Sequence, residues 1–497
     1  MTGKKISRGA AVALCLLAGL LAHGQQPVAP AATTAAPLPA AGLETMLRRV
    51  MQERRIPGLQ VAVVQHGRVA LLQSYGWANL QDSIPVTNQS IFAINSCTKA
   101  FTGVAVMQLV EAGKVALTAP VSRYLDGLPA AWQPVTIRQL LTHVSGLPDV
   151  LRVLSPGTGG LAGLGSEAAA WAKVQALPMD FVTGEQFSYN QTNYLLLGKI
   201  IDKLSGQPFA QVFSERQFRV AAMPRTVFAD SREVIPHLAP TYKYETSLDG
   251  QKFSEGKLTN SYAEFPPSRR TASGLNSTAE DVAHWLIALQ QGRLLSTKTA
   301  LNTLWTAGTY NNGTPTQWAL GWVAKPRARH RAVIATGGGR SAFFVYPQDD
   351  LAVVVLTNLA GAYPEDFIDE AAGYFNPEIP ASDPITALRM QLQKRGFDQA
   401  SAVFKELKKK DKSFAPSEVD LNDWAYRMMA NRQLKEALAV FKLTLELYPR
   451  SWNAYDSYGE ALVKSGQPEQ ATAMYQKSVE LNPDNQNGKR ILEQLLK

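Results

Sequence analysis

Apolar and polar positions along the chain predict strands near residue 60 and near residue 340, with helical segments between them. GLQVAVVQHGRVALLQSYGW, which begins at Gly58, holds two β-rich runs around a polar turn at residues 66–68, and this pattern predicts a hairpin. Residues 331–346 and 350–358 predict a second strand pair, in which LAVVVLTN is a buried strand. Strands that enclose helices in this way predict an α+β domain over residues 42–375.

Two helices of this domain have recognisable ends. LETMLRRVMQERRI, which begins at Leu43, has an amphipathic period and is followed by Pro57-Gly58, where we expect the helix to stop. Ser277 and Glu280 form a capping box before DVAHWLIALQQG, so a helix is predicted to start at this point.

Beyond a linker predicted at residues 376–386, the chain repeats its own pattern. Matching residues recur at an interval of 34: Trp424 and Tyr458, Ala437 and Ala471, Phe441 and Tyr475, Leu447 and Leu481, Pro449 and Pro483. This interval is the length of a tetratricopeptide helix pair, so residues 387–497 are predicted to form such repeats, with clear copies over about 418–451 and 452–485. FDQASAVFKEL, around residue 400, is a degenerate earlier copy. Two unrelated amphipathic helix pairs would explain the apolar spacing but not five coincidences in register.

The first 24 residues have the pattern of a signal peptide. A basic start precedes an apolar stretch at residues 10–22, and Ala22-His23-Gly24 is a small-residue cleavage site. The apolar stretch is short for a membrane span, so we expect export to the periplasm or secretion, with an uncleaved anchor as the alternative. Residues 25–41 are rich in alanine and proline and are predicted to be a spacer.

Removal of this segment changes the charge and the cysteine count. Loss of Lys4, Lys5 and Arg8 takes the net charge from +9 to +6, and no dense basic run with interleaved aromatics follows, so nucleic-acid binding is not expected. Cys15 follows a leucine where lipoprotein signals carry a small residue, so lipidation is not expected. Cys97 would remain as a single thiol, which forms no internal disulfide.

NSCTKAF, residues 95–101, places Ser96 three residues before Lys99. The same S-x-x-K spacing occurs at Ser254 and Lys257, but only NSCTKAF is followed by a long apolar helical period. Ser96 would therefore lie at the N-terminus of a buried helix, with Lys99 on the same face. A lysine in apolar surroundings loses its charge readily and can accept a proton. An N-cap serine beside a solvated lysine is the alternative.

Four further segments follow NSCTKAF in a fixed order: LLTHVSGLPD at 140–149, GEQFSYNQTNYLLLGKII at 184–201, ASGLNSTAEDVAHWL at 272–286 and TGGGRSAFFVYP at 336–347. Together they resemble the serine beta-lactamase and penicillin-binding protein family in its class C-like branch, over about residues 43–359. The resemblance implies an antiparallel sheet flanked by helices, a mainly helical subdomain, and catalysis through an acyl-enzyme on a serine.

The resemblance also implies roles for particular residues. Ser96 aligns with the family nucleophile, Lys99 with its activating lysine, and Tyr189 with the tyrosine of the Y-x-N motif, which shares proton transfer with the lysine. The backbone N–H groups of Ser96 and Gly338 align with the oxyanion hole.

This chain departs from the family pattern in two motifs. Gln191 stands where Y-x-N has asparagine, and so moves the amide by one methylene. Ala335, before Thr336 and Gly337, stands where the third motif has lysine or histidine, so the cation that holds a substrate carboxylate is missing. Arg340 is the nearest candidate to replace it, and an exposed, solvated arginine is the alternative. Gln191, Thr336, Gly337 and Arg340 are the expected substrate-binding residues.

No metal or cofactor is expected, because the chain has no H-E-x-x-H motif and its histidines are scattered. We expect His143 to bond locally and fix its turn, and Cys97 to be a small core residue. The predicted function is an exported serine hydrolase that cleaves an ester or amide through a Ser96 acyl-enzyme. A small molecule or peptide is the expected substrate, and an esterase or peptidase is favoured over a true beta-lactamase. A binding protein that has lost catalysis, with repeats that recruit a protein partner, is the alternative.

Overall fold

The computed structural model describes residues 38–153, 166–245, 248–249, 252–253, 256–325 and 327–496. The predicted signal peptide, most of the predicted spacer and Ser254 lie outside these ranges. Helix α1 spans Leu38–Arg54 and so includes the last four positions assigned to the spacer. A proline in the first turn of a helix costs little because the N–H it lacks has no partner there, so Pro39 does not prevent the earlier start.

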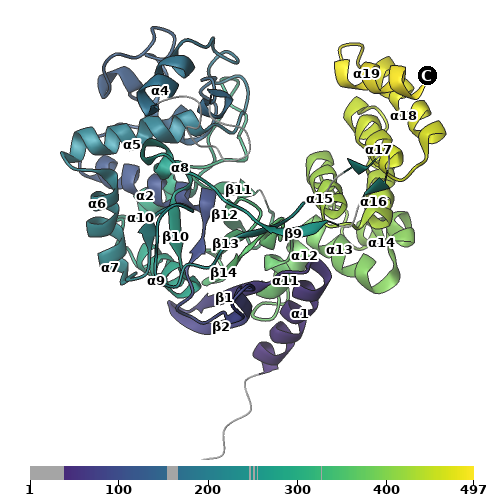
Figure 1. Cartoon of the computed structure of the whole chain (residues 1–497), viewed down its shortest axis with the longest axis horizontal. Helices are drawn as coiled ribbons and strands as arrows, with labels where there is room; N and C mark the ends of the chain where they lie inside the picture. The colour runs from purple at the N-terminus through teal and green to yellow at the C-terminus, as the bar shows by residue number, and fades with distance from the viewer. Residues whose placement is uncertain are drawn as a thin grey trace, which may run out of the picture.

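One antiparallel sheet forms the centre of the fold (Figure 1). Its strands, in spatial order, are β11 (Val323–Lys325), β12 (Ala332–Gly337), β13 (Ser341–Tyr346), β14 (Leu351–Thr357), β1 (Gly58–Gln65), β2 (Arg68–Asn79) and β3 (Ile84–Pro85). The predicted hairpin of β1 and β2 is present, and β1 also pairs with β14, where Leu59 lies opposite Thr357. The centre of the sheet therefore joins two segments that are far apart in the sequence.

Both faces of the sheet are covered by helices, because its strands are apolar on both sides. On one face, Ala62 and Val64 pack into a core formed by α2 (Thr98–Glu111), α5 (Gln191–Ser205), α9 (Ala279–Gln290) and α10 (Lys298–Trp305). On the other face, Val61 and Val63 pack against α1 and α11 (Ile368–Ala372). Helix α2 is buried on nearly all sides, as expected from its continuous apolar sequence.

Shorter elements surround this centre. A small sheet contains β4 (Phe92–Ala93), β10 (Leu275–Ser277) and β5 (Val227–Phe228). Another three-stranded sheet contains β15 (Leu359–Ala360), β6 (Tyr242–Glu245) and β9 (Lys257–Asn260), and β7 (Leu248–Asp249) pairs with β8 (Lys252–Phe253). The short helices are α3 (Ile137–Leu141), α4 (Glu167–Gln175), α6 (Phe209–Phe213), α7 (Arg219–Ala221) and α8 (Arg270–Ser273).

Two predicted boundaries differ from the structure. The segment 331–346 is a hairpin of β12 and β13, whereas a single strand is predicted there, because the glycines at 337–339 turn the chain with φ of 58° at Gly338. The cap of α9 is Thr278 and not Ser277: the Thr278 side chain accepts a hydrogen bond from the Asp281 amide at 3.1 Å.

The C-terminal part is helical and lies beside α11 and α12 (Ile379–Ser382) (Figure 1). Its helices are α13 (Pro384–Arg395), α14 (Ala400–Lys410), α15 (Glu418–Ala430), α16 (Leu434–Leu447), α17 (Trp452–Lys464), α18 (Pro468–Leu481) and α19 (Gln486–Leu495). Helices α15 and α16 form a pair that is followed by a second pair, α17 and α18, and residue 452 at the start of α17 comes 34 positions after residue 418 at the start of α15.

The segment 376–386, predicted as a linker, is a packed part of the fold. It contains α12 (Ile379–Ser382) and the start of α13, and the Ile379 side chain is fully buried. Asp383 lies between these helices and makes ion pairs with Lys325 at 2.7 Å and Arg327 at 3.6 Å. Asp383 of this segment thus makes buried ion pairs with residues that lie far away in the sequence. These ion pairs join the C-terminal helices to the sheet domain.

Within the described ranges, none of the helices combines the length and the hydropathy needed to cross a bilayer.

Candidate active site

Ser96 lies on a short 3-10 turn, Asn95–Cys97, that leads directly into α2. The Thr98 hydroxyl donates to the Asn95 carbonyl at 2.6 Å and accepts from the Leu275 amide at 3.1 Å. The Ile94 amide donates to the Leu275 carbonyl at 3.0 Å. Strand β10 therefore holds the turn that presents the Ser96 hydroxyl.

The Lys99 side chain is fully buried, one helical turn after Ser96. Its Nζ donates to the Gln191 Oε1 at 3.0 Å and to the Ala272 carbonyl at 2.9 Å, and lies 3.5 Å from the Ser96 Oγ. Burial lowers the pKa of Lys99 well below its ordinary value, and the charge of Asp149 opposes this shift only in part.

These contacts fit an uncharged amine. A neutral lysine has two N–H donors and one lone pair, whereas an ammonium group has three donors. Gln191 and Ala272 accept two hydrogen bonds from the amine. Because burial lowers the pKa of Lys99 and so favours the neutral form, its lone pair is available to the Ser96 hydroxyl. The arrangement lets Lys99 take a proton from Ser96.

Tyr189 lies above the same amine. The Lys99 Nζ is 4.5 Å from the centroid of the Tyr189 ring. Tyr189 is 36% exposed as a residue, and its hydroxyl interacts with the side chains of Ser96 and Gln191. Burial of this hydroxyl raises the pKa of Tyr189 above its ordinary value, and the contacts with Ser96 and Gln191 offset the rise only in part. The phenol is therefore protonated at neutral pH and can donate a hydrogen bond.

The His143 ring packs against the Tyr189 ring. Its ring centroid is 4.6 Å from that of Tyr189 and 5.0 Å from that of Trp318. The Asn190 amide donates to the His143 Nδ1 at 3.1 Å, so the histidine bonds to the segment that carries Tyr189 as well as occupying its own turn. Burial lowers the pKa of His143 well below its ordinary value, with the nearby Lys99 adding to the effect. His143 is thus a neutral, buried supporting residue.

The glycine turn after β12 closes on the Ser96 turn. A Cβ atom on Gly337 would lie 1.9 Å from the Ile94 carbonyl oxygen, so only glycine fits there. Gly338 is exposed, and its amide donates to no other residue in the described part of the chain. Gly338 can therefore offer a free N–H beside Ser96, as an oxyanion hole requires.

Two residues near the centre are not among the predicted site residues. The Ser273 Oγ lies 3.4 Å from the Ser96 Oγ, at the end of α8. Asp149 accepts from the Gln191 amide at 3.3 Å, and burial raises its pKa. Both occur within segments that carry the family resemblance, at positions where serine or aspartate alone gives no sign of a role.

The remaining predicted substrate-binding residues, Thr336 and Arg340, line two different cavities. Thr336 is half-buried and lines a cavity of about 600 Å³ together with Phe187 and Trp318. Asp420 and Trp424 of α15 line the same cavity, so the C-terminal helices form one of its walls.

Arg340 lies in a different cavity and is only 7% exposed, so the solvated alternative is wrong. Ala335 packs in the core with 4% exposure.

Cys97 is fully buried, and its Sγ contacts the Ser341 carbonyl at 3.5 Å. Burial raises the pKa of Cys97 well above its ordinary value. The thiol is therefore a core group, as predicted.

Comparison with known proteins agrees with this geometry. A family model described as Beta-lactamase matches residues 43–373. Penicillin-binding protein 4* of Bacillus subtilis (strain 168) is 26% identical over 301 residues, which cover 60% of this chain and 66% of that protein. Teichoic acid D-alanine hydrolase of Staphylococcus aureus is 26% identical over 301 residues, 61% of this chain and 70% of that protein. The chain thus spans slightly less than two thirds of the first relative.

Among solved structures, the octameric penicillin-binding protein homologue from Pyrococcus abyssi superposes with a TM-score of 0.58. It is 26% identical in sequence, and the match covers 70% of this chain and 81% of that one. The family model spans most of the chain, and the sheet, the S-x-x-K helix and the tyrosine segment lie within it. The chain belongs to the Beta-lactamase family.

Proposed function

We propose that the protein is a serine hydrolase that cleaves an ester or amide through an acyl-enzyme on Ser96. The observation that carries this proposal is the contact of the Ser96 Oγ with a buried amine whose other hydrogen bonds are already made. A domain that had lost catalysis would have no need to keep Lys99 desolvated beside Ser96, because a buried amine is costly.

The reaction follows from these positions. The Ser96 oxygen attacks the substrate carbonyl carbon while its proton passes to Lys99. Negative charge develops on the carbonyl oxygen, where the amides of Ser96 and Gly338 donate hydrogen bonds. The bond to the leaving group then breaks, and that group takes a proton from Lys99, with the Tyr189 hydroxyl bridging the transfer. Water attacks the acyl carbon while one of its protons passes to Lys99; the bond to the Ser96 oxygen then breaks, that oxygen takes the proton back from Lys99, and the acid is released.

The substrate preference follows from the third motif. Ala335 provides no cation where the family carries one, so an ester or a peptide is favoured over a beta-lactam whose carboxylate would need that cation. Gln191 retains an amide in the site, and its oxygen accepts from Lys99. A role in orienting the base therefore accounts for the longer side chain.

The C-terminal helices are proposed to be tetratricopeptide repeats that bind a protein partner. Their support is the 34-residue recurrence together with two consecutive helix pairs, in which Ala437 and Phe441 of the first copy are buried like Ala471 and Tyr475 of the second. Export is proposed from the N-terminal pattern alone, with the periplasm or the exterior as the destination.

A fluorophosphonate probe tests the hydrolase proposal, because it labels serines that are already activated. We expect labelling of the native chain, loss of labelling in Ser96→Ala, and a labelled peptide that contains Ser96. Ser254→Ala is the matched control, since it removes the serine of the other S-x-x-K sequence. Labelling that persists in Ser96→Ala, or that maps to Ser254, would refute the proposal.

A further inference from the structure

The Ser273 hydroxyl contacts the Ser96 oxygen but takes no part in the proton transfers assigned to Lys99 and Tyr189. The two Oγ atoms are 3.4 Å apart, and Ser273 is only 8% exposed. Within the described ranges, the Ser96 Oγ is the one hydrogen-bond partner of this hydroxyl. A serine in a helix can bond back to the carbonyl one turn before it, and Ser273 makes no such bond in the described part of the chain. Its hydroxyl is therefore directed at the nucleophilic oxygen.

The direction of this hydrogen bond follows from the other partners of Ser96. A hydroxyl has one proton to donate and two lone pairs that accept. The Ser96 proton is assigned to Lys99, whose Nζ lies 3.5 Å away. The Ser96 oxygen therefore accepts from Ser273. Its second lone pair faces the hydroxyl of Tyr189, which keeps its proton at neutral pH.

Ser273 is held in place by bonds from both helices that carry the catalytic side chains. The hydroxyl of neighbouring Thr271 donates to the Tyr194 carbonyl of α5 at 2.8 Å. The Thr271 carbonyl accepts from the Thr102 hydroxyl of α2 at 2.7 Å. The next carbonyl, that of Ala272, accepts from the catalytic amine at 2.9 Å. A segment fixed on both sides gives the Ser273 hydroxyl a defined position, as a catalytic group requires.

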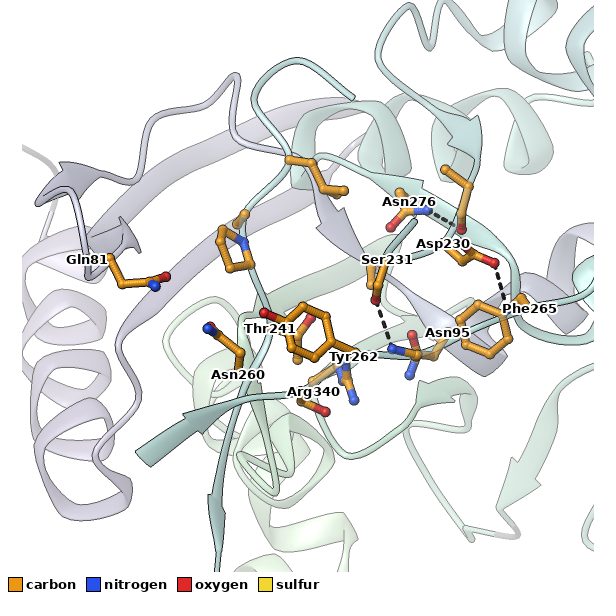
Figure 2. A pocket seen from close by; sticks show the side chains of 17 residues that line it. Gln81, Asn95, Asp230, Ser231, Thr241, Asn260, Tyr262, Phe265, Asn276 and Arg340 are labelled. Atoms are coloured by element: carbon orange, nitrogen blue, oxygen red, sulfur yellow. Dashed lines mark hydrogen bonds between the residues drawn. The ribbon is translucent and has the colours of Figure 1, made fainter. Parts of the chain in front are cut away.

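This contact is independent of the cavity that Arg340 lines (Figure 2). Asn95, the residue before Ser96, lines that cavity, whereas Ser273 is not among the described residues that line it. The Ser273 hydroxyl thus faces the nucleophile and not a separate ligand-binding space.

We propose that Ser273 is a further catalytic residue, whose hydroxyl donates a hydrogen bond to the Ser96 oxygen and speeds the departure of that oxygen from the acyl-enzyme. The proposal rests on the proposed hydrolase function. In this step water adds to the acyl carbon and gives one proton to Lys99. The bond between the acyl carbon and the Ser96 oxygen then breaks, the oxygen keeps the bonding electron pair, and the proton returns to it from Lys99. Ser273 keeps its own proton throughout.

The Ser273 hydrogen bond should assist deacylation more than acylation, because the acceptor strength of the Ser96 oxygen changes along the reaction. Before acylation this oxygen belongs to a hydroxyl, which accepts well. In the acyl-enzyme it is an ester oxygen, which shares a lone pair with the carbonyl and accepts weakly. As it leaves it carries negative charge, and a hydrogen bond to a charged group is about twice as strong as a neutral one. The gain between ground state and transition state, which is what raises a rate, is therefore larger from the acyl-enzyme than from the free enzyme.

Hydrolysis of 4-nitrophenyl butyrate separates the two steps. Release of 4-nitrophenol in the first turnover measures acylation. Loss of the butyryl adduct from Ser96, followed by mass spectrometry after removal of free ester, measures deacylation. We expect Ser273→Ala to slow the loss of the adduct about 10-fold and to change acylation by less than about 3-fold. Where deacylation limits turnover, kcat and KM should fall together and leave kcat/KM nearly unchanged.

Two further variants separate this role from a structural one. Ser277→Ala removes another buried hydroxyl of the same segment, which contacts the Thr226 hydroxyl at 2.7 Å, and should leave both rate constants unchanged. Ser273→Thr retains the hydroxyl and should restore part of the deacylation rate. Near-native acylation in Ser273→Ala would itself show that the variant is folded and that Ser96 and Lys99 keep their geometry.

Three results would overturn the inference. Loss of the adduct at the native rate in Ser273→Ala would show that the contact does not help the oxygen to leave. An equal slowing of both steps would give Ser273 a structural role. A butyryl group found on Ser273 would make it an acyl acceptor and not a hydrogen-bond donor. A native chain that forms no adduct on Ser96 would instead refute the hydrolase proposal, and this inference would fall with it.

Discussion

Asp383 joins the C-terminal helices to the sheet domain. The substitution Asp383→Asn removes its charge and keeps the shape of the side chain. Its side chain is 4% exposed, and it makes ion pairs with Lys325 and Arg327. Removal of one partner from a buried pair costs about 3–5 kcal/mol. Lys325 keeps Asp420 at 3.5 Å and Arg327 keeps Asp369 at 2.7 Å, so Asp383→Asn should lower the free energy of unfolding by a smaller amount, about 2–3 kcal/mol.

Asparagine also caps helices well, so the hydrogen bond from the Thr386 amide at 2.9 Å should persist and the charge effect is isolated. Urea unfolding followed by tryptophan fluorescence measures the change. Asp126→Asn is the control, because the Asp126–Lys203 pair is exposed and should give no measurable loss.

The loss of stability caused by Asp383→Asn should depend on pH. Burial opposes ionisation, but Lys325 and Arg327 hold the folded pKa of Asp383 below its ordinary value. Its contribution to stability is therefore fully present above the unfolded pKa of about 3.9 and is lost as pH falls through the folded pKa. The difference between native chain and variant should be constant from about pH 5 to pH 8 and shrink in acid. A loss no larger than that of Asp126→Asn would refute the idea that buried charges hold the helices.

Three further outcomes are expected. For a neutral ester, kcat/KM should rise with pH as Lys99 loses its proton. Asp149→Asn should move this rise to lower pH, because the charge of Asp149 raises the Lys99 pKa. A pH profile that does not move would contradict the assignment of Lys99 as the base. Cys97 should resist a disulfide reagent in the native chain and react after unfolding in urea, and fast native reaction would show that it is not buried. Gly337→Ala should reduce kcat about 100-fold, because the added Cβ would push β12 away from Ile94 and displace the site. Unimpaired turnover would show that the close contact between Gly337 and Ile94 is unimportant.

Local patterns in the sequence are enough to predict the parts of the site that lie within one segment. The S-x-x-K spacing places Ser96 and Lys99 on one helix face, and the apolar run that follows predicts the burial of Lys99. The hairpin of β1 and β2 follows from two β-rich runs around a polar turn. These features depend on neighbours within a few residues.

Other features depend on contacts between distant segments, which no local pattern contains. The Ala272 carbonyl and the Ser273 hydroxyl contact Lys99 and Ser96 only after β10 packs beside the Ser96 turn. The buried ion pairs of residues 376–386 likewise come from partners that composition cannot identify, so a segment rich in proline and polar residues has the pattern of a linker. Tertiary pairing turns that segment into part of the fold.

The pairing of β1 with β14 sets the order in which the molecule can form. The Gly58 amide donates to the Asn358 Oδ1 at 2.8 Å across a separation of 300 residues. Ribosomes add about 5–20 residues per second, so β1 waits about 15 to 60 s for this partner during synthesis. Contacts of such long range also slow refolding, because a large loop must close before they form. Hydrolysis should therefore return late in refolding, together with the closing of the sheet.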